Sequence, residues 1–179
     1  MLQVYRSRGL AAALDKATAS GTLKVGEAVR PLSVKDAEGH IVEIGGSGDS
    51  ARRATVVVYV FSPECGWCKR NAASIEKLAR AVAGKYRFVA VSLAPVSPAQ
   101  YEEARKLGFP VITELPAEIA AAYRFQSTPE TVVISPQSRV VKVWLGAYLG
   151  ETRKEVEKFF SVSLPDLGAQ RGAEPIRME

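Results

Sequence analysis

The stretch TVVVYVFSPECGWCKRN, residues 55–71, decides the fold because it joins a buried strand to the start of a helix through a short turn. Residues 55–61 are continuously apolar, β-branched or aromatic, which is typical of a strand covered on both faces. After Pro63, apolar residues recur three and four positions apart as far as Val82, which predicts an amphipathic helix ending near Gly84.

The segments on either side of this stretch alternate between strand and helix patterns. Before it, two short extended runs joined by a glycine-containing turn predict a hairpin; after it, strands and helices alternate and a second hairpin precedes a closing helix. The expected elements are strands at 29–34, 40–44, 86–93, 110–113, 131–135 and 140–145, and helices at 97–108, 116–123 and 152–160. This order predicts an α/β fold with a parallel core sheet, helices on both faces and an antiparallel edge.

A chain of 179 residues is most simply one domain with terminal extensions. We expect an arm or linker at residues 1–22 and a folded domain at 23–162. Residues 163–179 are rich in Gly, Pro and charge, and we expect a mobile tail there.

The net charge of +5 comes from 24 Lys and Arg against 19 Asp and Glu, without a long run of like charge. No basic stripe is interleaved with aromatic residues, so we expect no nucleic-acid partner. The longest apolar runs, 55–61 and 88–95, are far shorter than the roughly 20 residues that span a membrane. Residues 1–20 are neither a signal peptide nor an anchor as they stand; an export segment or membrane anchor missing upstream of Met1 is compatible with this sequence.

Cys65 and Cys68 are the only cysteines of the chain. Cys65 is expected at the helix N-terminus, where free N–H groups and the helix dipole favour a thiolate and lower a cysteine pKa to roughly 3.5–7.5. Cys68 lies one helical turn later on the same face, within reach of a disulfide. The spacing therefore predicts a redox pair with Cys65 as nucleophile and Cys68 as the resolving thiol.

Four other uses of the cysteine pair are less compatible with the sequence. A structural zinc site needs four ligands, and the chain offers two cysteines and His40, so we expect neither metal nor cofactor. A structural disulfide closing so small a loop would restrain the unfolded chain very little. A peroxiredoxin-type site would place proline at position 58, which is Val, and a copper chaperone would have wider cysteine spacing and a later histidine.

The stretch VVVYVFSPECGWCKRN resembles the active-site strand, turn and helix of the thioredoxin-like family. The later stretch STPETVVISPQSRVVKVWLG, residues 127–146, resembles the proline-bearing loop and hairpin of that family, with Pro129 at the cis-proline position. The resemblance implies a thioredoxin-like α/β sandwich, a mixed central sheet flanked by helices with an N-terminal hairpin extension. It also implies thiol–disulfide exchange with protein substrates, in which Thr128 and Pro129 form the substrate platform.

Residues 23–44, and a strand and helix inserted between residues 109 and 125, resemble the exported branch of that family. This branch contains periplasmic or membrane-anchored oxidoreductases that serve cytochrome c maturation and similar tasks. The resemblance covers about residues 23–162 and implies reduction of protein disulfides outside the cytoplasm, with an unidentified upstream reductant or oxidant. Oxidation or isomerisation, a cytoplasmic location, and a redox-sensing binding module without turnover remain alternatives.

The sequence departs from the family pattern at two positions near the cysteines. Tyr59 stands where the family often carries a buried acid, and we hypothesise that Glu64 or water moves the proton instead. Trp67, between the cysteines, is expected either to contact partner proteins or to shield the sulfurs. Phe61, Phe88, Phe109 and Trp144 are assigned to the core, and His40 to the surface.

Overall fold

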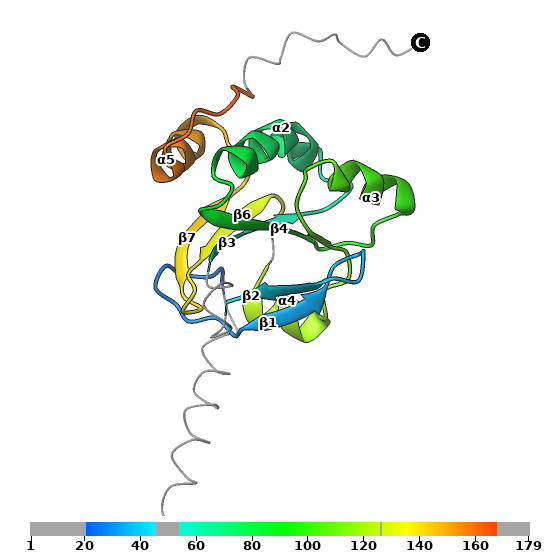
Figure 1. Ribbon diagram of the computed structural model, residues 1–179. Coiled ribbons are helices and arrows are strands. Elements are labelled where there is room, and N and C mark those ends of the chain that lie inside the picture. Colours follow the sequence, from blue (N-terminus) through cyan, green and yellow to red (C-terminus); the bar gives the residue numbers. More distant parts are fainter. Residues whose placement is uncertain (1–20, 46–53, 126, 168–179) are drawn as a thin grey trace, which may run out of the picture.

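The computed structural model describes residues 21–45, 54–125 and 127–167 (Figure 1). In chain order the elements are β1 (Leu32–Lys35), β2 (Ile41–Ile44), β3 (Thr55–Phe61), α2 (Gly66–Ala81), β4 (Tyr86–Ser92), α3 (Pro98–Arg105), β5 (Val111–Ile112), α4 (Ala117–Tyr123), β6 (Glu130–Ile134), β7 (Val140–Leu145) and α5 (Gly150–Phe160). They form a two-stranded sheet, β1-β2, and a five-stranded sheet in the order β5-β4-β3-β6-β7.

The five-stranded sheet is mixed. Strand β3 pairs in parallel with β4, and β4 in parallel with β5. On the other side of β3, strands β6 and β7 are antiparallel to their neighbours. The predicted parallel core with an antiparallel edge and an N-terminal hairpin is confirmed.

Strand β3 is buried on both faces, as its uninterrupted apolar sequence predicts. Its alternate side chains enter two different cores: Val57, Tyr59 and Phe61 pack in the core that α2 and α5 cover. Val56, Val58 and Val60 instead pack with residues of β1, β2 and α4. Figure 1 shows the same layers, with α2, α3 and α5 above the central sheet and β1, β2 and α4 below it.

The predicted ends of the helices differ from the observed ones by a few residues. Cys65 is the N-cap of α2, which therefore begins at Gly66. Helix α3 begins with the predicted capping box, in which Ser97 and Gln100 exchange side-chain and backbone hydrogen bonds. The closing helix α5 starts at Gly150, two residues before the predicted start, and its Val156 and Phe160 are buried while Phe159 is half-buried.

Strand β5 is shorter than the four residues that the sequence predicts. It pairs with β4 only at Ala90 and Val91. The residue before it is Pro110, which has no N–H to donate and so cannot extend the ladder towards Phe88.

The described chain remains packed beyond the expected domain boundary at residue 163. Leu164 and Leu167 are buried, and the N–H of Leu164 donates to Oε1 of Glu157 at 2.7 Å. The folded part therefore continues through Leu167. Residues 1–20 of the expected arm and 168–179 of the expected tail lie outside the described residues.

No helix among the described residues is both long and apolar enough to cross a membrane.

A buried polar network joins α2 to the segment after β7. The backbone N–H of Tyr148 donates to Oδ1 of Asn71 at 3.0 Å, and the hydroxyl groups of Tyr148 and Thr131 lie 2.8 Å apart. All three residues are fully buried. A buried N–H without a partner costs free energy. The hydrogen bond that Asn71 accepts from Tyr148 therefore stabilises this contact in addition to packing.

We predict that Asn71→Ala lowers the free energy of unfolding by about 1–3 kcal/mol, because it leaves the Tyr148 N–H buried without an acceptor. Ser74→Ala is the matched control in the same helix, since the Ser74 hydroxyl is buried without a hydrogen-bond partner among the described residues. Urea unfolding of both variants measures the difference. Equal losses in the two variants would contradict the assigned role of Asn71.

A second prediction concerns the carboxylate of Glu157. The hydrogen bond from the Leu164 N–H, with help from Arg153, lowers the pKa of Glu157. A lowered folded-state pKa gives stability that is present above the unfolded-state value of about 4.3 and is lost as the pH falls through the folded-state pKa. We expect Glu157→Gln to reduce the free energy of unfolding at neutral pH, and the difference from the unmodified protein to shrink below about pH 4.

Unfolding curves across this pH range test the Glu157 prediction. Glu151→Gln is the control, because the contact of Glu151 with the rest of the described chain is an exposed pair with Lys154 at 2.6 Å. A difference that stays constant with pH would show that the charge of Glu157 is not what stabilises the segment.

Candidate active site

Cys65 and Cys68 form a disulfide at the end of β3, with their Cα atoms 5.2 Å apart. The strand ends at Phe61, and the turn that follows is closed by the N–H of Cys65, which donates to the carbonyl of Ser62 at 3.0 Å. Cys65 then caps α2: its Sγ accepts the N–H of Cys68 at 3.0 Å. The predicted position of Cys65 at the helix N-terminus is confirmed.

The two cysteine residues differ in their exposure. Cys65 is half-buried, whereas Cys68 is only 6% exposed and belongs to the core between the sheet and α2. The first turn of α2 contains no acidic residue, so no carboxylate in that turn offsets the positive potential of the helix N-terminus at Cys65. A helix N-terminus favours a thiolate on Cys65, and Cys65 is the more accessible of the two cysteines.

Tyr59 lies on the face of β3 that α2 and α5 cover, in the same core as Cys68, and is 2% exposed. Burial raises the pKa of Tyr59 to about 12, and the neighbouring Asn71 side chain opposes that rise. Tyr59 is therefore a neutral phenol at physiological pH and cannot accept a proton as a carboxylate would.

Glu64 is tied to α3. Its Oε1 accepts Nε2 of Gln100 at 2.6 Å, and the same Gln100 side chain accepts the N–H of Ser97 at 3.0 Å. One glutamine thus closes the capping box of α3 and holds the turn before Cys65. The sequence predicts the capping box, but the link to Glu64 joins residues that are 36 positions apart and has no local signal.

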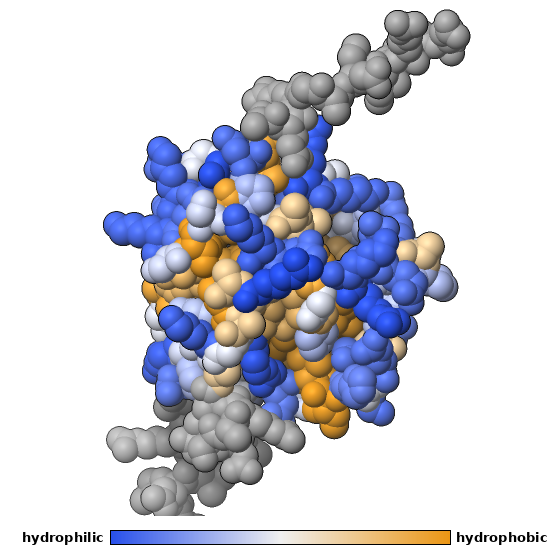
Figure 2. Space-filling model, turned by 45° about the horizontal axis from the view of Figure 1, so that its top comes forward, coloured by the Kyte–Doolittle hydropathy of each residue, from blue (hydrophilic) through white to orange (hydrophobic). Residues whose placement is uncertain are grey.

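Trp67 is 49% exposed, in the first turn of α2. The guanidinium carbon of Arg70 lies 5.0 Å from the centre of its ring, within the range of a cation–π contact. Figure 2, in which the helix-covered side is turned forward, shows apolar areas separated by predominantly hydrophilic side chains. About half of the Trp67 side chain is therefore open to solvent in the same turn as the disulfide.

The Thr128–Pro129 peptide bond is cis, and Pro129 is buried while Thr128 is half-buried. The register of the sheet explains why this loop lies near the cysteines. Val60 of β3 pairs with Glu130 of β6 in an antiparallel ladder. Pro129, the residue before Glu130, therefore lies just beyond the end of this ladder, where β3 leads into the disulfide turn. The carbonyl of Pro129 accepts the N–H of Gly146 at 2.8 Å, which fixes the loop against β7.

Glu130 is a buried residue beside the cis-proline loop that the sequence patterns did not single out. This glutamate follows Pro129 directly, pairs with Val60 and Leu145 in the sheet, and is fully buried. A carboxylate at the start of an otherwise apolar strand is the signal that could have identified it, because an ionisable residue is rarely buried without a specific reason.

A cavity of about 290 Å³ lies beside Cys68, between α2 and α3. Its inner wall includes Tyr59, Phe61 and Cys68, and its rim includes Gln100 and Glu103. Small solutes and water can therefore approach the inner sulfur from the side of α3.

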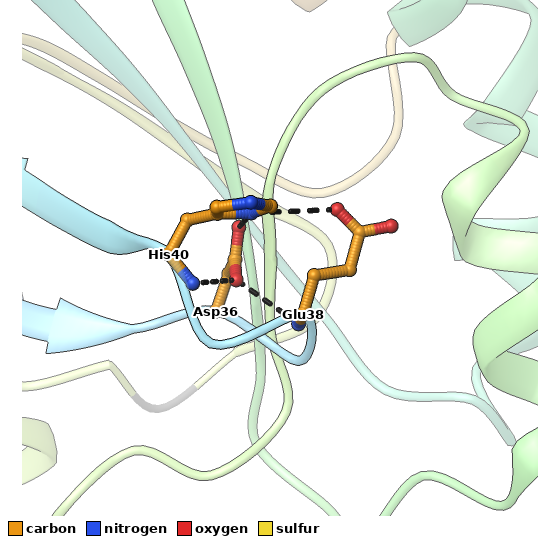
Figure 3. Close-up of side chains that lie close together, drawn as sticks. All are labelled: Asp36, Glu38 and His40. Atoms are coloured by element: carbon orange, nitrogen blue, oxygen red, sulfur yellow. Dashed lines mark hydrogen bonds and ion pairs between the residues drawn. The ribbon is translucent and has the colours of Figure 1, made fainter.

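Asp36, Glu38 and His40 are the group among the described residues whose spacing could suit a metal ion (Figure 3). Their contacts are those of a hairpin turn: Oδ1 of Asp36 accepts the N–H of Glu38 at 3.0 Å and of His40 at 2.8 Å. The His40 side chain is 73% exposed, which confirms its assignment to the surface. The turn accounts for this cluster without a metal.

Comparison with solved structures finds thioredoxin-like proteins. The thioredoxin domain of a thiol-disulfide oxidoreductase from Bacteroides vulgatus is 18% identical, with a TM-score of 0.61 over 78% of this chain and 99% of that one. StoA from Bacillus subtilis is 19% identical, with a TM-score of 0.57 over 71% and 96%. A putative thiol:disulfide interchange protein DsbE from Chlorobium tepidum is 17% identical, with a TM-score of 0.58 over 78% and 96%.

These likenesses establish the thioredoxin-like fold that the sequence predicted. Comparison with curated proteins finds no match. The sequence pattern of the AhpC/TSA family matches residues 25–143, which include both cysteines, the cis-proline loop and most of the sheet. Because that match covers well over half of the chain, the protein belongs to the AhpC/TSA family.

Proposed function

We propose that this protein is a thiol–disulfide oxidoreductase that reduces disulfides in protein substrates. The observation that carries the proposal is the asymmetric disulfide at the N-terminus of α2, with Cys65 accessible and Cys68 buried behind it. The solved structures described above as thiol-disulfide oxidoreductase and thiol:disulfide interchange protein support the same chemistry.

In the proposed reaction, the Cys65 thiolate attacks one sulfur of a substrate disulfide. An S–S bond forms between Cys65 and the substrate, and the second substrate sulfur leaves as a thiolate that takes up a proton. Cys68 then loses its proton and attacks Sγ of Cys65, which releases the first substrate sulfur. The protein is oxidised by two electrons, the substrate disulfide becomes a dithiol, and an upstream thiol reductant must restore the pair.

The exposed side of the disulfide supplies the proposed substrate platform. Thr128, half-buried before the cis-proline, would pair through its backbone with an extended substrate segment, and Pro129 would pack beside the disulfide. Trp67 would contact the substrate through its exposed ring. These roles follow from the resemblance of the loop and from the register that brings it to the end of β3.

The next part of the proposal concerns the compartment in which the protein works. The hairpin β1-β2 and the inserted β5 and α4 are formed by the segments whose sequences resemble the exported branch, so we propose that the protein works outside the cytoplasm. A redox-sensing module that binds a partner without turnover is the alternative. Turnover separates the two, because a catalyst reduces many equivalents of insulin with a recycling reductant, and a switch reduces one.

The direction of electron flow is tested by the reduction potential of the Cys65–Cys68 pair in defined thiol/disulfide buffers. We expect a value near roughly −270 mV, typical of a reductant, and a value near about −120 mV would assign an oxidant instead.

Val58 lies in the buried middle of β3 at the position where a peroxidase would need proline. Turnover with hydrogen peroxide but not with insulin would contradict the proposal.

Single cysteine variants give the next prediction. Cys68→Ser should accumulate a mixed disulfide between Cys65 and the substrate, because no second thiol remains to resolve it. Cys65→Ser should neither turn over nor trap substrate, since the remaining cysteine, Cys68, is only 6% exposed. Non-reducing mass analysis after incubation with insulin measures both outcomes. Equal trapping by the two variants would contradict the assigned order.

The proposed proton acceptor for Cys68 is Glu64, directly or through water in the neighbouring cavity. Glu64→Gln should slow the resolving step while retaining the hydrogen bond with Gln100, because the amide cannot take up a proton. The control is Glu102→Gln, which changes an exposed carboxylate paired with Arg105 on α3. Stopped-flow rates across pH measure the step, and an unchanged rate for Glu64→Gln would remove Glu64 from the mechanism.

A further inference from the structure

The cavity between α2 and α3 reaches the disulfide at Cys68 and not at Cys65. One face of α2 forms part of its wall and contributes Cys68, Lys69, Ala72 and Glu76. Neither Cys65 nor any residue of the proposed substrate platform lines the cavity. A molecule inside it would therefore meet Cys68, whereas a protein on the platform would meet Cys65.

The size of the cavity selects for small molecules. Its volume is about 290 Å³, and much of its wall is apolar, from Tyr59, Phe61, Pro63, Ala72, Ala104 and Leu107. For comparison, an apolar cavity of roughly 150 Å³ is enough to hold benzene. A thiol with a short carbon chain therefore fits beside Cys68, and a folded protein does not.

The charged side chains of the wall leave one cation outside an ion pair. Glu76 pairs with Arg80, and Glu103 pairs with Lys106. Lys69 is exposed and pairs with no carboxylate in the part of the chain that the structure describes. A positive charge at the opening of the cavity favours the approach of a thiolate over that of a cation.

The two sulfurs also differ as leaving groups. Attack on one sulfur of a disulfide expels the other as a thiolate, and the more stable thiolate leaves faster. Cys65 is the N-cap of α2, where the helix N-terminus stabilises a thiolate, whereas Cys68 lies in the core. Attack at Cys68 therefore expels the better leaving group, and the cavity gives small thiols that route.

We propose that low-molecular-weight thiols reduce the oxidised pair by entering this cavity and attacking Sγ of Cys68. The inference rests on the proposed function, for which it names the chemical class of the upstream reductant. The first thiolate forms an S–S bond with Cys68, the bond between Cys68 and Cys65 breaks, and Cys65 leaves as a thiolate. A second small thiol attacks the sulfur of the first, which releases Cys68 and forms the small disulfide. Two electrons and two protons pass from the small thiols to the cysteines.

The first test measures access to Cys68 in the reduced full chain. In Cys65→Ser, the Cys68 thiol should react with methyl methanethiosulfonate although it does not trap insulin. Adding Ala72→Leu, which places an isopropyl group in the cavity wall, should slow this reaction by roughly tenfold or more, because the reagent must cross that space. Ala73→Leu, at an exposed position of the same helix outside the cavity, is the control. The increase in mass with time measures each rate.

The charge of Lys69 gives a second variant, which leaves the core unchanged because Lys69 is exposed. In the Cys65→Ser background, an anionic reagent, sulfonatoethyl methanethiosulfonate, is compared with a cationic one, trimethylammonioethyl methanethiosulfonate. Lys69→Glu should lower the ratio of the anionic to the cationic rate by about fivefold, since the charge beside the opening is reversed. Lys77→Glu, an exposed cation of α2 outside the cavity, should change the ratio much less.

The oxidised protein tests the reaction itself. Mercaptoethanol should reduce Ala72→Leu more slowly than the unmodified protein by roughly fivefold or more, because the added group fills the route to Cys68. A large thiol, ubiquitin carrying one surface cysteine, should react with both proteins at equal rates. After an early acid quench, fragmentation of the peptide that contains both cysteines should locate the mercaptoethanol adduct on Cys68.

Four results would overturn the proposal. They are a Cys68 thiol that methyl methanethiosulfonate does not modify in the folded protein, a rate that Ala72→Leu leaves unchanged, a reagent ratio that Lys69→Glu leaves unchanged, or an adduct located on Cys65. The Lys69→Glu ratio decides alone where Ala72→Leu does not fold. Trapping of insulin by Cys68→Ser is measured in parallel. Where that trapping occurs, a failed cavity test removes only the small-thiol route, and where it does not occur, the proposed activity itself fails.

Discussion

The burial of β3 on both faces is the constraint on which the rest of the structure depends. A strand whose side chains are apolar in every position must lie in the centre of a sheet that is covered above and below. The helices α2 and α5 supply one cover, and α4 with the N-terminal hairpin supplies the other. Because β3 is central, its carboxyl end opens at the middle of the sheet, and the disulfide turn is held there by packed elements on every side.

The two cysteines of the disulfide lie in different environments at that point. The helix N-terminus leaves the Cys65 sulfur near solvent, whereas the adjoining core encloses Cys68 together with Tyr59. Tyr59 stays uncharged, so the inner side of the site has no acid on β3, and the nearest exposed acid in the turn is Glu64, bound to Gln100. The polar groups that do enter this core, such as Asn71 and Thr131, are fixed by hydrogen bonds to Tyr148. A rigid buried side and an accessible outer side suit a pair of thiols with different tasks.

Features that depend on residues close together in the sequence were predictable. The apolar run of β3, the periodicity of α2, the capping box of α3 and the spacing of the cysteines each depend on contacts within a few positions along the chain. Features that join distant segments were not. The burial of Glu130 depends on its neighbours in β3 and β7, and the packing of Leu164 depends on a carboxylate seven residues earlier and on the core beneath it.

The sequence by itself determined the fold class, the strand-turn-helix around the cysteines and the pairing of Cys65 with Cys68 within reach of a disulfide. Periodicity and residue type act locally, through backbone preferences and the burial of one face. Only the tertiary structure decided that Pro129 lies at the end of β3, that Gln100 holds Glu64, and that β5 is too short to cover β4. These depend on sheet register and on the geometry of packing between remote segments, where a shift of one residue would turn every side chain to the other face.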